Sequence, residues 1–306
     1  MKIFVEMSYL KPEDYQLLVD SFPKQDFTNE IDLSYDAEII ISMPGYLLKD
    51  NLKKYLKLKM ICLLTAGYDT LDLTYIQSRG IVLANAKDVF SIQIAEDIFA
   101  KILYMNRNYK LYQEQMKDGV WKHHPVTHEI AESTVGIIGT GSIGQEVAKR
   151  MKAFGAKTVG YRKRNESVPH IDHLYTTKEG LYQLYQESDY IIISIPLDQH
   201  TTHFVDNHAF SLMKKDALII NVARGKIIDQ DAMIHALKTN RIRGVCLDVM
   251  TPEPLPMNHE LWKLSNVFIT PHNASASPHV RKRLMQVVVS TLEAYLQNRK
   301  LENQVL

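Results

Sequence analysis

Residues 136–151 read GIIGTGSIGQEVAKRM, with the glycines in the spacing G-x-G-x-x-G. The apolar run TVGIIG (134–139) leads into the first glycine and predicts a buried strand. After the last glycine, apolar residues recur on one side at helical spacing, which predicts an amphipathic helix. The glycine spacing is a weak signal by itself. A strand, a glycine turn and a helix in this order are typical of a dinucleotide-binding fold.

Each glycine has a separate physical reason in such a turn. Gly139 permits the tight turn, Gly141 lets the backbone approach a pyrophosphate, and Gly144 lets the helix pack closely on the strand. The start of the helix offers N–H groups and the positive end of the helix dipole to the phosphates. The residues of the turn expected to bind a cofactor are Gly139, Thr140, Gly141, Ser142, Ile143 and Gly144.

Outside this turn, short apolar runs alternate with amphipathic segments, a pattern that indicates parallel sheets with crossover helices. The expected strands are 2–6, 37–42, 60–64, 80–84, 134–139, 157–161, 190–196, 217–223, 244–249 and 266–271. One long helix is expected from Ser91 to Met116, an irregular connection over 118–133, and a final helix over 278–300.

Composition narrows the class of protein. A chain of 306 residues is too long for one ordinary core, which suggests two domains. With 36 Lys and Arg against 35 Asp and Glu, bulk charge gives no support for nucleic acid or an anionic membrane as a partner. No apolar run approaches the roughly 20 residues that span a bilayer, and the first residues lack the apolar core of a signal peptide.

The cysteines and histidines indicate neither a disulfide framework nor a metal site. Cys62 and Cys246 each lie in an apolar run, which predicts buried free thiols in a reducing compartment and hence a cytoplasmic protein. Histidines in loops do not have the spacing of a metal-ligand set, so no metal is expected. They are His123, His124, His128, His170 and His173.

Several stretches together resemble the D-isomer-specific 2-hydroxyacid dehydrogenase family, almost from end to end. They are LLTAGYDTLDL (63–73), RGIVLANA (79–86), AED (95–97), VGIIGTGSIG (135–144), SIPLDQHTTHFV (194–205), LMKKDALIINVARGKIIDQDAMIHAL (212–237), GVCLDVMTPEPLP (244–256) and ITPHNA (269–274). The resemblance implies an α/β fold of two doubly wound parallel-sheet domains. A Rossmann cofactor domain, 99–274, would be inserted into a discontinuous flavodoxin-like substrate domain, 1–98 and 275–306.

The same resemblance implies a homodimer and the reversible reduction of a 2-keto acid to a D-2-hydroxy acid. Its catalytic residues map onto Arg224 of NVARG, Glu253 of PEP and His272 of TPH. A planar guanidinium suits the carboxylate and carbonyl oxygens of a 2-keto acid. An imidazole can donate a proton near neutral pH, and a neighbouring carboxylate favours its charged form. Each residue also has a structural alternative. Arg224 could form a salt bridge, Glu253 could be a solvated loop residue, and His272 could be a structural histidine.

Further binding residues follow from the resemblance. Ala66 and Gly67, in LLTAGYD, and Met43, in the SMPGY loop, are expected to bind substrate together with Arg224 and His272. Asp248 falls where the family binds the nicotinamide carboxamide, with a strand-end cap as the alternative. The other residues expected to contact the cofactor are Pro196, Thr201 and Ala223. Residues near Trp121 and His123 could also line the pocket.

Residues 157–164, KTVGYRKR, bear on which cofactor is bound. An acid about 20 residues after the first glycines binds the adenosine ribose in NAD-specific folds of this type, and the family commonly has Asp there. This chain has Arg162, followed by Lys163 and Arg164. Arginine can pair with a ribose 2′-phosphate, which a carboxylate would repel. We expect NADP(H) to be preferred, with NAD(H) possible; the alternative is a solvated basic loop.

Two other functions fit the sequence. Some proteins of this fold are dinucleotide-sensing corepressors that keep the catalytic residues, although this chain shows no tail for partner recruitment. A short-form phosphoglycerate dehydrogenase is the second alternative. Turnover of 2-keto acids such as glyoxylate, hydroxypyruvate or a branched-chain or aromatic analogue would separate a reductase from a binding protein.

Overall fold

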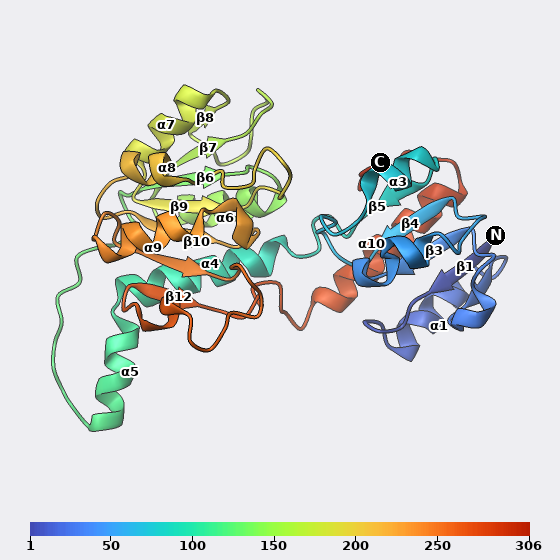
Figure 1. The fold of residues 1–306 in the computed structure, drawn as a ribbon, viewed down its shortest axis with the longest axis horizontal. Coiled ribbons are helices and arrows are strands. Elements are labelled where there is room, and N and C mark those ends of the chain that lie inside the picture. Colours follow the sequence, from blue (N-terminus) through green and yellow to red (C-terminus); the bar gives the residue numbers. More distant parts are fainter. The chain divides into compact units, whose positions relative to one another are not determined.

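The computed structural model describes residues 1–306, with the side chain of Lys49 left out. The chain forms two compact units (Figure 1). One contains Met1–Phe90 and Ser277–Leu306, and the other contains Ser91–Ala276. Each unit has one sheet in which all neighbouring strands are parallel. The expected α/β fold with two parallel-sheet domains is therefore confirmed.

The unit that contains both chain ends has a five-stranded sheet in the order β2-β1-β3-β4-β5. Its strands are β1 (Lys2–Val5), β2 (Asp26–Thr28), β3 (Ile39–Ser42), β4 (Met60–Leu63) and β5 (Val82–Ala84). Its helices are α1 (Pro12–Ser21), η1 (Ile31–Leu33), η2 (Pro44–Leu47), α2 (Lys49–Leu52), α3 (Leu73–Ser78) and α10 (Val280–Leu296). Every residue of β3 and β4 is buried, which explains their continuous apolar runs.

The second unit has a seven-stranded sheet in the order β12-β11-β10-β9-β6-β7-β8. Its strands are β6 (Thr134–Ile138), β7 (Lys157–Tyr161), β8 (His173–Tyr175), β9 (Tyr190–Ile193), β10 (Leu218–Asn221), β11 (Gly244–Leu247) and β12 (Val267–Ile269). Its helices are α4 (Ser91–Asn106), α5 (Tyr109–Asp118), α6 (Ser142–Ala153), α7 (Lys178–Glu187), α8 (Asn207–Leu212), η3 (Gly225–Ile227), α9 (Gln230–Lys238) and η4 (Glu260–Lys263). The strand order reverses between β6 and β9, where open α/β sheets bind ligands at the carboxyl edge.

The structure differs from the sequence prediction in three elements. The single helix expected from Ser91 to Met116 is wrong, because α4 ends at Asn106 and Asn108 adopts a left-handed φ of 56° before α5 begins. Asparagine tolerates that conformation better than most residues. Strands β2 and β8 were not expected, since both are three residues long at a sheet edge and have at most one buried residue.

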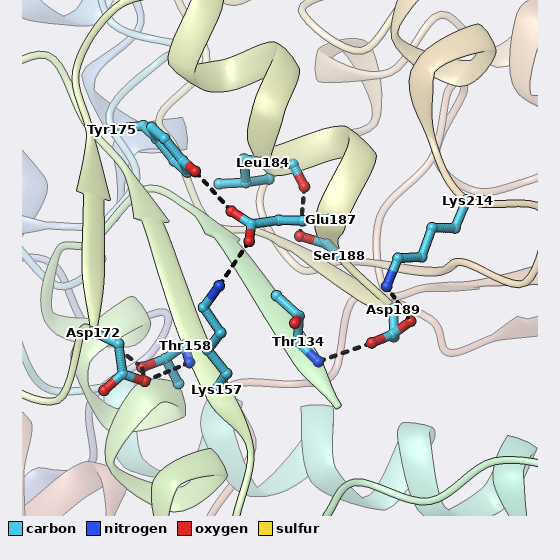
Figure 2. Close-up of polar contacts among 10 residues, drawn as sticks. All are labelled: Thr134, Lys157, Thr158, Asp172, Tyr175, Leu184, Glu187, Ser188, Asp189 and Lys214. Atoms are coloured by element: carbon cyan, nitrogen blue, oxygen red, sulfur yellow. Dashed lines mark hydrogen bonds and ion pairs between the residues drawn. The ribbon is translucent and has the colours of Figure 1, made fainter. Parts of the chain in front are cut away.

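Polar side chains tie together the starts of the strands in the seven-stranded sheet (Figure 2). Asp189, directly before β9, accepts the N–H of Thr134 at 2.8 Å and the ammonium of Lys214 at 2.7 Å. Asp172 accepts the N–H of Thr158 at 2.8 Å. These charged groups fix the register at the amino edge of the sheet. The residues with predicted chemical roles follow the strands at the opposite, carboxyl edge.

The two cysteines are buried and form no disulfide, as expected. Burial raises the pKa of Cys62 and that of Cys246 to about 12, so both thiols remain protonated at neutral pH. Within the described residues, no helix combines the length and apolar character needed to cross a bilayer.

Candidate active site

The glycine turn lies at the reversal point of the seven-stranded sheet, between β6 and α6. Gly139 has φ +100°, and a Cβ there would lie 2.8 Å from the carbonyl carbon of Ser194. A Cβ on Gly144 would lie 2.2 Å from the carbonyl oxygen of Gly139. Only glycine fits either position without displacing backbone, so this turn requires the glycines that the sequence places there.

The turn has the features that suit a dinucleotide pyrophosphate. A Cβ on Gly141 would meet nothing within 4 Å, so the space before the start of α6 is open. Thr140 is 2% exposed, and its hydroxyl has no hydrogen-bond partner among the residues that the structure describes. An open helix start with a buried, unpaired hydroxyl beside it can receive phosphate or ribose oxygens.

Arg162 follows β7 directly and lies at the same edge of the sheet. Its backbone N–H donates to the carbonyl of Tyr175 at 3.1 Å, which holds the chain at this position. The side chain of Arg162 is 26% exposed, and its Nη2 lies 3.4 Å from Oε2 of Glu166. Lys163 and Arg164 are exposed. Sequence reasoning missed Glu166, because a surface acid four residues away has no motif to identify it.

The loop after β9 is closed by its own side chains. The hydroxyl of Thr201 donates to the carbonyl of Pro196 at 2.7 Å and accepts the N–H of Asp198 at 2.7 Å. Burial alone would raise the pKa of Asp198. Hydrogen bonds from His200 and Thr201 and the positive charge of Lys163 outweigh burial and lower the pKa below its ordinary value. The acid at Asp198 therefore offsets part of the charge of the basic stretch.

Arg224, Asp248 and His272 follow the carboxyl ends of three adjacent strands, β10, β11 and β12. The strands are in register, with Asn221 paired to Leu247 and Leu247 to Ile269. Residues separated by up to 48 positions therefore meet at one sheet edge.

The turn that carries Arg224 is held by Asn221. The amide of Asn221 donates to the carbonyl of Arg224 at 3.0 Å and accepts the N–H of Ala223 at 3.0 Å. Arg224 is half-buried, and its Nη1 donates to the carbonyl of Ala223 at 2.7 Å. A Cβ on Gly225 would lie 2.2 Å from the carbonyl carbon of Met250. The Arg224 turn therefore packs directly on the backbone of the loop that leads to Glu253.

Glu253 and His272 form a pair. Nδ1 of His272 lies 2.7 Å from Oε2 of Glu253, and the other carboxylate oxygen accepts the N–H of Met250 at 3.0 Å. The side chain of His272 is 48% exposed, and the backbone φ of His272 is 50°. Because Nδ1 faces Glu253, Nε2 on the far side of the ring is the nitrogen that can meet a substrate.

Gln230, at the start of α9, holds the loop before Glu253. Its Nε2 donates to the carbonyl of Thr251 at 2.6 Å, and its Oε1 accepts the N–H of Thr251 at 3.1 Å. The sequence prediction did not include Gln230. A lone amide side chain in a helix is a common feature that carries no functional signal.

Asp248 holds the loop that carries His272. Its Oδ1 accepts the hydroxyl of Thr270 at 2.5 Å and the N–H of Asn273 at 2.9 Å, and its Oδ2 accepts the N–H of Ala274 at 3.0 Å. Its backbone carbonyl accepts the N–H of His272 at 2.9 Å. Asp248 thus shapes the loop that carries His272, and its contact with a nicotinamide carboxamide stays a prediction.

In the unit with both chain ends, Met43 and the Ala66–Gly67 turn follow the neighbouring strands β3 and β4. The hydroxyl of Thr65 donates to the carbonyl of Gly67 at 2.8 Å, and the amide of Asn85 donates to that of Ala66 at 2.7 Å. The predicted substrate-binding turn is thereby held in one conformation.

Histidine, cysteine and acidic side chains do not gather into a group of three or more that could hold a metal ion anywhere in the described part of the chain. The imidazole of His272, held by the carboxylate of Glu253, is a group that can exchange a proton with an organic substrate, and the guanidinium of Arg224 is one that can bind a carboxylate.

Comparison with known proteins agrees with this geometry. A family model described as D-isomer specific 2-hydroxyacid dehydrogenase, NAD binding domain, matches residues 99–274. A glyoxylate reductase of Pyrococcus horikoshii is 37% identical over 248 residues, which are 78% of this chain and 73% of that protein. A D-3-phosphoglycerate dehydrogenase of Methanocaldococcus jannaschii is 33% identical over 278 residues, 88% of this chain and 52% of that protein.

Two solved structures resemble the whole chain. An acyclic imino acid reductase in complex with NADPH and D-Arg is 29% identical, with a TM-score of 0.87 over 100% of both chains. A D-lactate dehydrogenase from Aquifex aeolicus, complexed with NAD and lactic acid, is 26% identical, with a TM-score of 0.78 over 97% of this chain and 96% of that one. The chain therefore belongs to the D-isomer specific 2-hydroxyacid dehydrogenase family and is an NAD(P)-dependent oxidoreductase that acts on CH–OH groups.

Proposed function

We propose that this enzyme reduces a small 2-keto acid to the D-2-hydroxy acid, and catalyses the reverse reaction, with His272 as the proton donor. The observation that carries the proposal is the 2.7 Å contact between Nδ1 of His272 and Oε2 of Glu253, on loops beside the turn of Arg224. We assign cofactor binding to residues 99–274 and substrate binding to residues 1–98 with 275–306.

The proposed roles follow from the charge that develops during reduction. When bound, the nicotinamide supplies a hydride to the carbonyl carbon and accepts one in the reverse direction. The carboxylate of Glu253 favours the charged imidazolium of His272, whose Nε2 then protonates the developing alkoxide. Arg224 binds the substrate carboxylate and stabilises negative charge on the reacting oxygen. Met43 and the Ala66–Gly67 turn supply further contacts to the substrate.

Glyoxylate and hydroxypyruvate are the proposed best substrates, because glyoxylate reductases recur among the relatives at 31–37% identity. The test is a panel of 2-keto acids assayed with NADPH and with NADH, followed by chiral analysis of the products that have a stereocentre, such as the glycerate formed from hydroxypyruvate; the glycolate formed from glyoxylate has none. The panel should include 3-phosphoglycerate in the oxidative direction and a keto acid mixed with an amine, since related proteins bear those activities in their names. An L-hydroxy acid product, or no turnover of any keto acid, would contradict the proposal.

Arg224→Lys is expected to lower kcat/KM for the keto acid by roughly 10–150-fold, the scale of one charge-assisted hydrogen bond. The positive charge remains, but the planar fork that can bind two oxygens together is lost. Steady-state kinetics measure the loss, and the dissociation constant of NADPH should change much less. Arg241→Lys is the matched control, because Arg241 donates to the carbonyl of Ser211 away from the site. Equal kcat/KM in the two variants would remove Arg224 from substrate binding.

We also propose that two copies of the chain form a homodimer through α5 and the segment that follows it. This part projects away from the sheet of its own unit (Figure 1). It carries apolar side chains in water, including Met116 at 80% exposure and Trp121 at 94%. Large exposed apolar groups close together mark an interface. Light scattering should give twice the mass of one chain, and a monomer at micromolar concentration would contradict the proposal.

A further inference from the structure

A buried lysine lies next to the carboxylate that shapes the His272 loop. Lys101, in α4, is 1% exposed and forms an ion pair with Asp97 one helical turn earlier. Its Nζ also lies 3.7 Å from Oδ1 of Asp248, which is 2% exposed. A buried ammonium is costly unless it is paired. Here the lysine is placed between two carboxylates, one on its own helix and one at the end of β11.

The charged members of this cluster are Lys101, Asp97 and Asp248. Burial raises the pKa of Asp97, and the negative charge of Asp248 adds to that effect, while Lys101 opposes it. Cys246 lies beside the cluster, with its Sγ 3.9 Å from the carbonyl of Lys101. Burial raises the pKa of this thiol to about 12, so it brings no charge at neutral pH. Lys101 is therefore the cation that offsets the two acids within the cluster.

The cluster is connected to His272 through Asp248. The carboxylate of Asp248 accepts three hydrogen bonds from Thr270, Asn273 and Ala274, which surround His272 in the chain. The oxygen next to Lys101, Oδ1, is the one that accepts from Thr270 and Asn273. A movement of this carboxylate by a fraction of an ångström would therefore move the loop on both sides of the imidazole.

We infer that Lys101 is a positioning residue: it fixes the carboxylate of Asp248, and through it the loop 270–274 and the imidazole of His272. The effect on catalysis rests on the proposed role of His272. The effect on the loop does not, because it follows from the hydrogen bonds of Asp248. The order of the loop and the rate of turnover are therefore separate readouts.

The decisive variant is the double substitution Lys101→Met with Asp97→Asn. Methionine keeps the length of the lysine side chain without its charge. Asparagine removes the charge of Asp97, so the cluster keeps the same net negative charge, now on Asp248 alone. Lys101→Met alone would leave the buried carboxylate of Asp248 and the part-exposed carboxylate of Asp97 without the ammonium between them, and could fail to fold. In the double variant we expect kcat for keto-acid reduction to fall about 10–100-fold, as misplacement of a reacting group can cost about 100-fold. The dissociation constant of NADPH should change by less than about threefold.

Hydrogen exchange measured by mass spectrometry without substrate tests the loop directly. The amides of Asn273 and Ala274 are donors to Asp248, so a peptide covering 270–276 should exchange faster in the double variant than in wild type. Arg79→Met is the matched control. It removes a half-buried cation that donates to the carbonyls of Tyr55 and Leu56, in the unit that contains both chain ends, and neither partner belongs to the cluster. It should lower the melting temperature without changing kcat or the exchange of 270–276.

Wild-type kcat and wild-type exchange in the double variant would overturn the inference, and so would an equal loss of kcat in Arg79→Met. If wild type turns over no keto acid, and residues 270–276 exchange faster in the double variant than in wild type, the proposed function is refuted and the positioning role stands. Normal turnover in wild type with unchanged exchange in the double variant would refute the positioning role alone.

Discussion

His272→Ala is expected to lower kcat for keto-acid reduction by roughly 10²–10⁴-fold, the usual scale of general acid catalysis. The imidazole paired with Glu253 is the proposed source of the proton, and alanine leaves the alkoxide without a donor. Pre-steady-state and steady-state assays with saturating NADPH measure the loss. His208→Ala is the control, since His208 is exposed and packs on Tyr182 away from the site. Near-normal turnover in His272→Ala would exclude His272 as the donor.

Glu253→Gln tests the pair from the other side. A carboxylate 2.7 Å from Nδ1 stabilises the imidazolium, and a neutral amide of the same shape does not. Reduction needs the charged ring, so we expect kcat/KM for the keto acid to be lower in the variant than in wild type, and the loss to grow as pH rises. Steady-state kinetics over a range of pH measure the loss. Equal kcat/KM in the two proteins at every pH would show that Glu253 does not stabilise the charged form of His272.

Arg162→Asp is expected to reverse the cofactor preference. We propose that wild type favours NADPH over NADH by at least about tenfold in kcat/KM, because one charge-assisted hydrogen bond to the 2′-phosphate is worth roughly 10–150-fold. The variant loses that donor, repels the phosphate and offers an acceptor to the ribose of NADH. The change in the NADPH to NADH ratio should therefore exceed about 100-fold. Kinetics with both cofactors at one ionic strength measure it.

The partner of Arg162 in the structure gives a second test of this prediction. Glu166 lies 3.4 Å away and is 64% exposed, and such surface pairs contribute little. Glu166→Gln should therefore strengthen NADPH binding modestly, by removing a competing charge, without reversing the preference. Lys215→Asp makes the same charge change as Arg162→Asp on an exposed residue at the amino edge of the sheet, just before β10. If Lys215→Asp alters the ratio as much as Arg162→Asp does, the effect is one of general charge and the phosphate contact is refuted.

Local patterns in the sequence were sufficient to predict both parallel sheets. Continuous apolar runs such as 39–41 and 190–193 mark strands buried on both faces, and the glycine turn at 139–144 marks where the second sheet begins. The edge strands β2 and β8 were missed, because an exposed edge of three residues needs no apolar run. The break at Asn108 was missed because a left-handed residue depends on what packs around it, and α5 has no buried residue to continue the line of α4.

The family motifs in the sequence indicated Arg224, Glu253 and His272. The structure brings Glu253 into contact with His272 and packs the turn of Arg224 against the loop before Glu253. Their roles remain predictions that the substitutions above test. What the sequence could not indicate is the arrangement behind them, in which Gln230 holds one loop and Asp248 holds the other. No motif assigned a role to Gln230, and the motif that indicated Asp248 predicted a cofactor contact or a strand-end cap without showing which loop it holds.

The sequence by itself determined the kind of fold, the glycine turn and the residue types that could perform the chemistry, because each of these follows from short stretches of chain. Only the tertiary structure placed Lys101 between Asp97 and Asp248, and Glu166 beside Arg162. Lys101 and Asp248 are 147 positions apart, and they meet because α4 packs beneath the strands of its own unit. A buried ion pair depends on position in space, and only packing of the whole unit establishes that position.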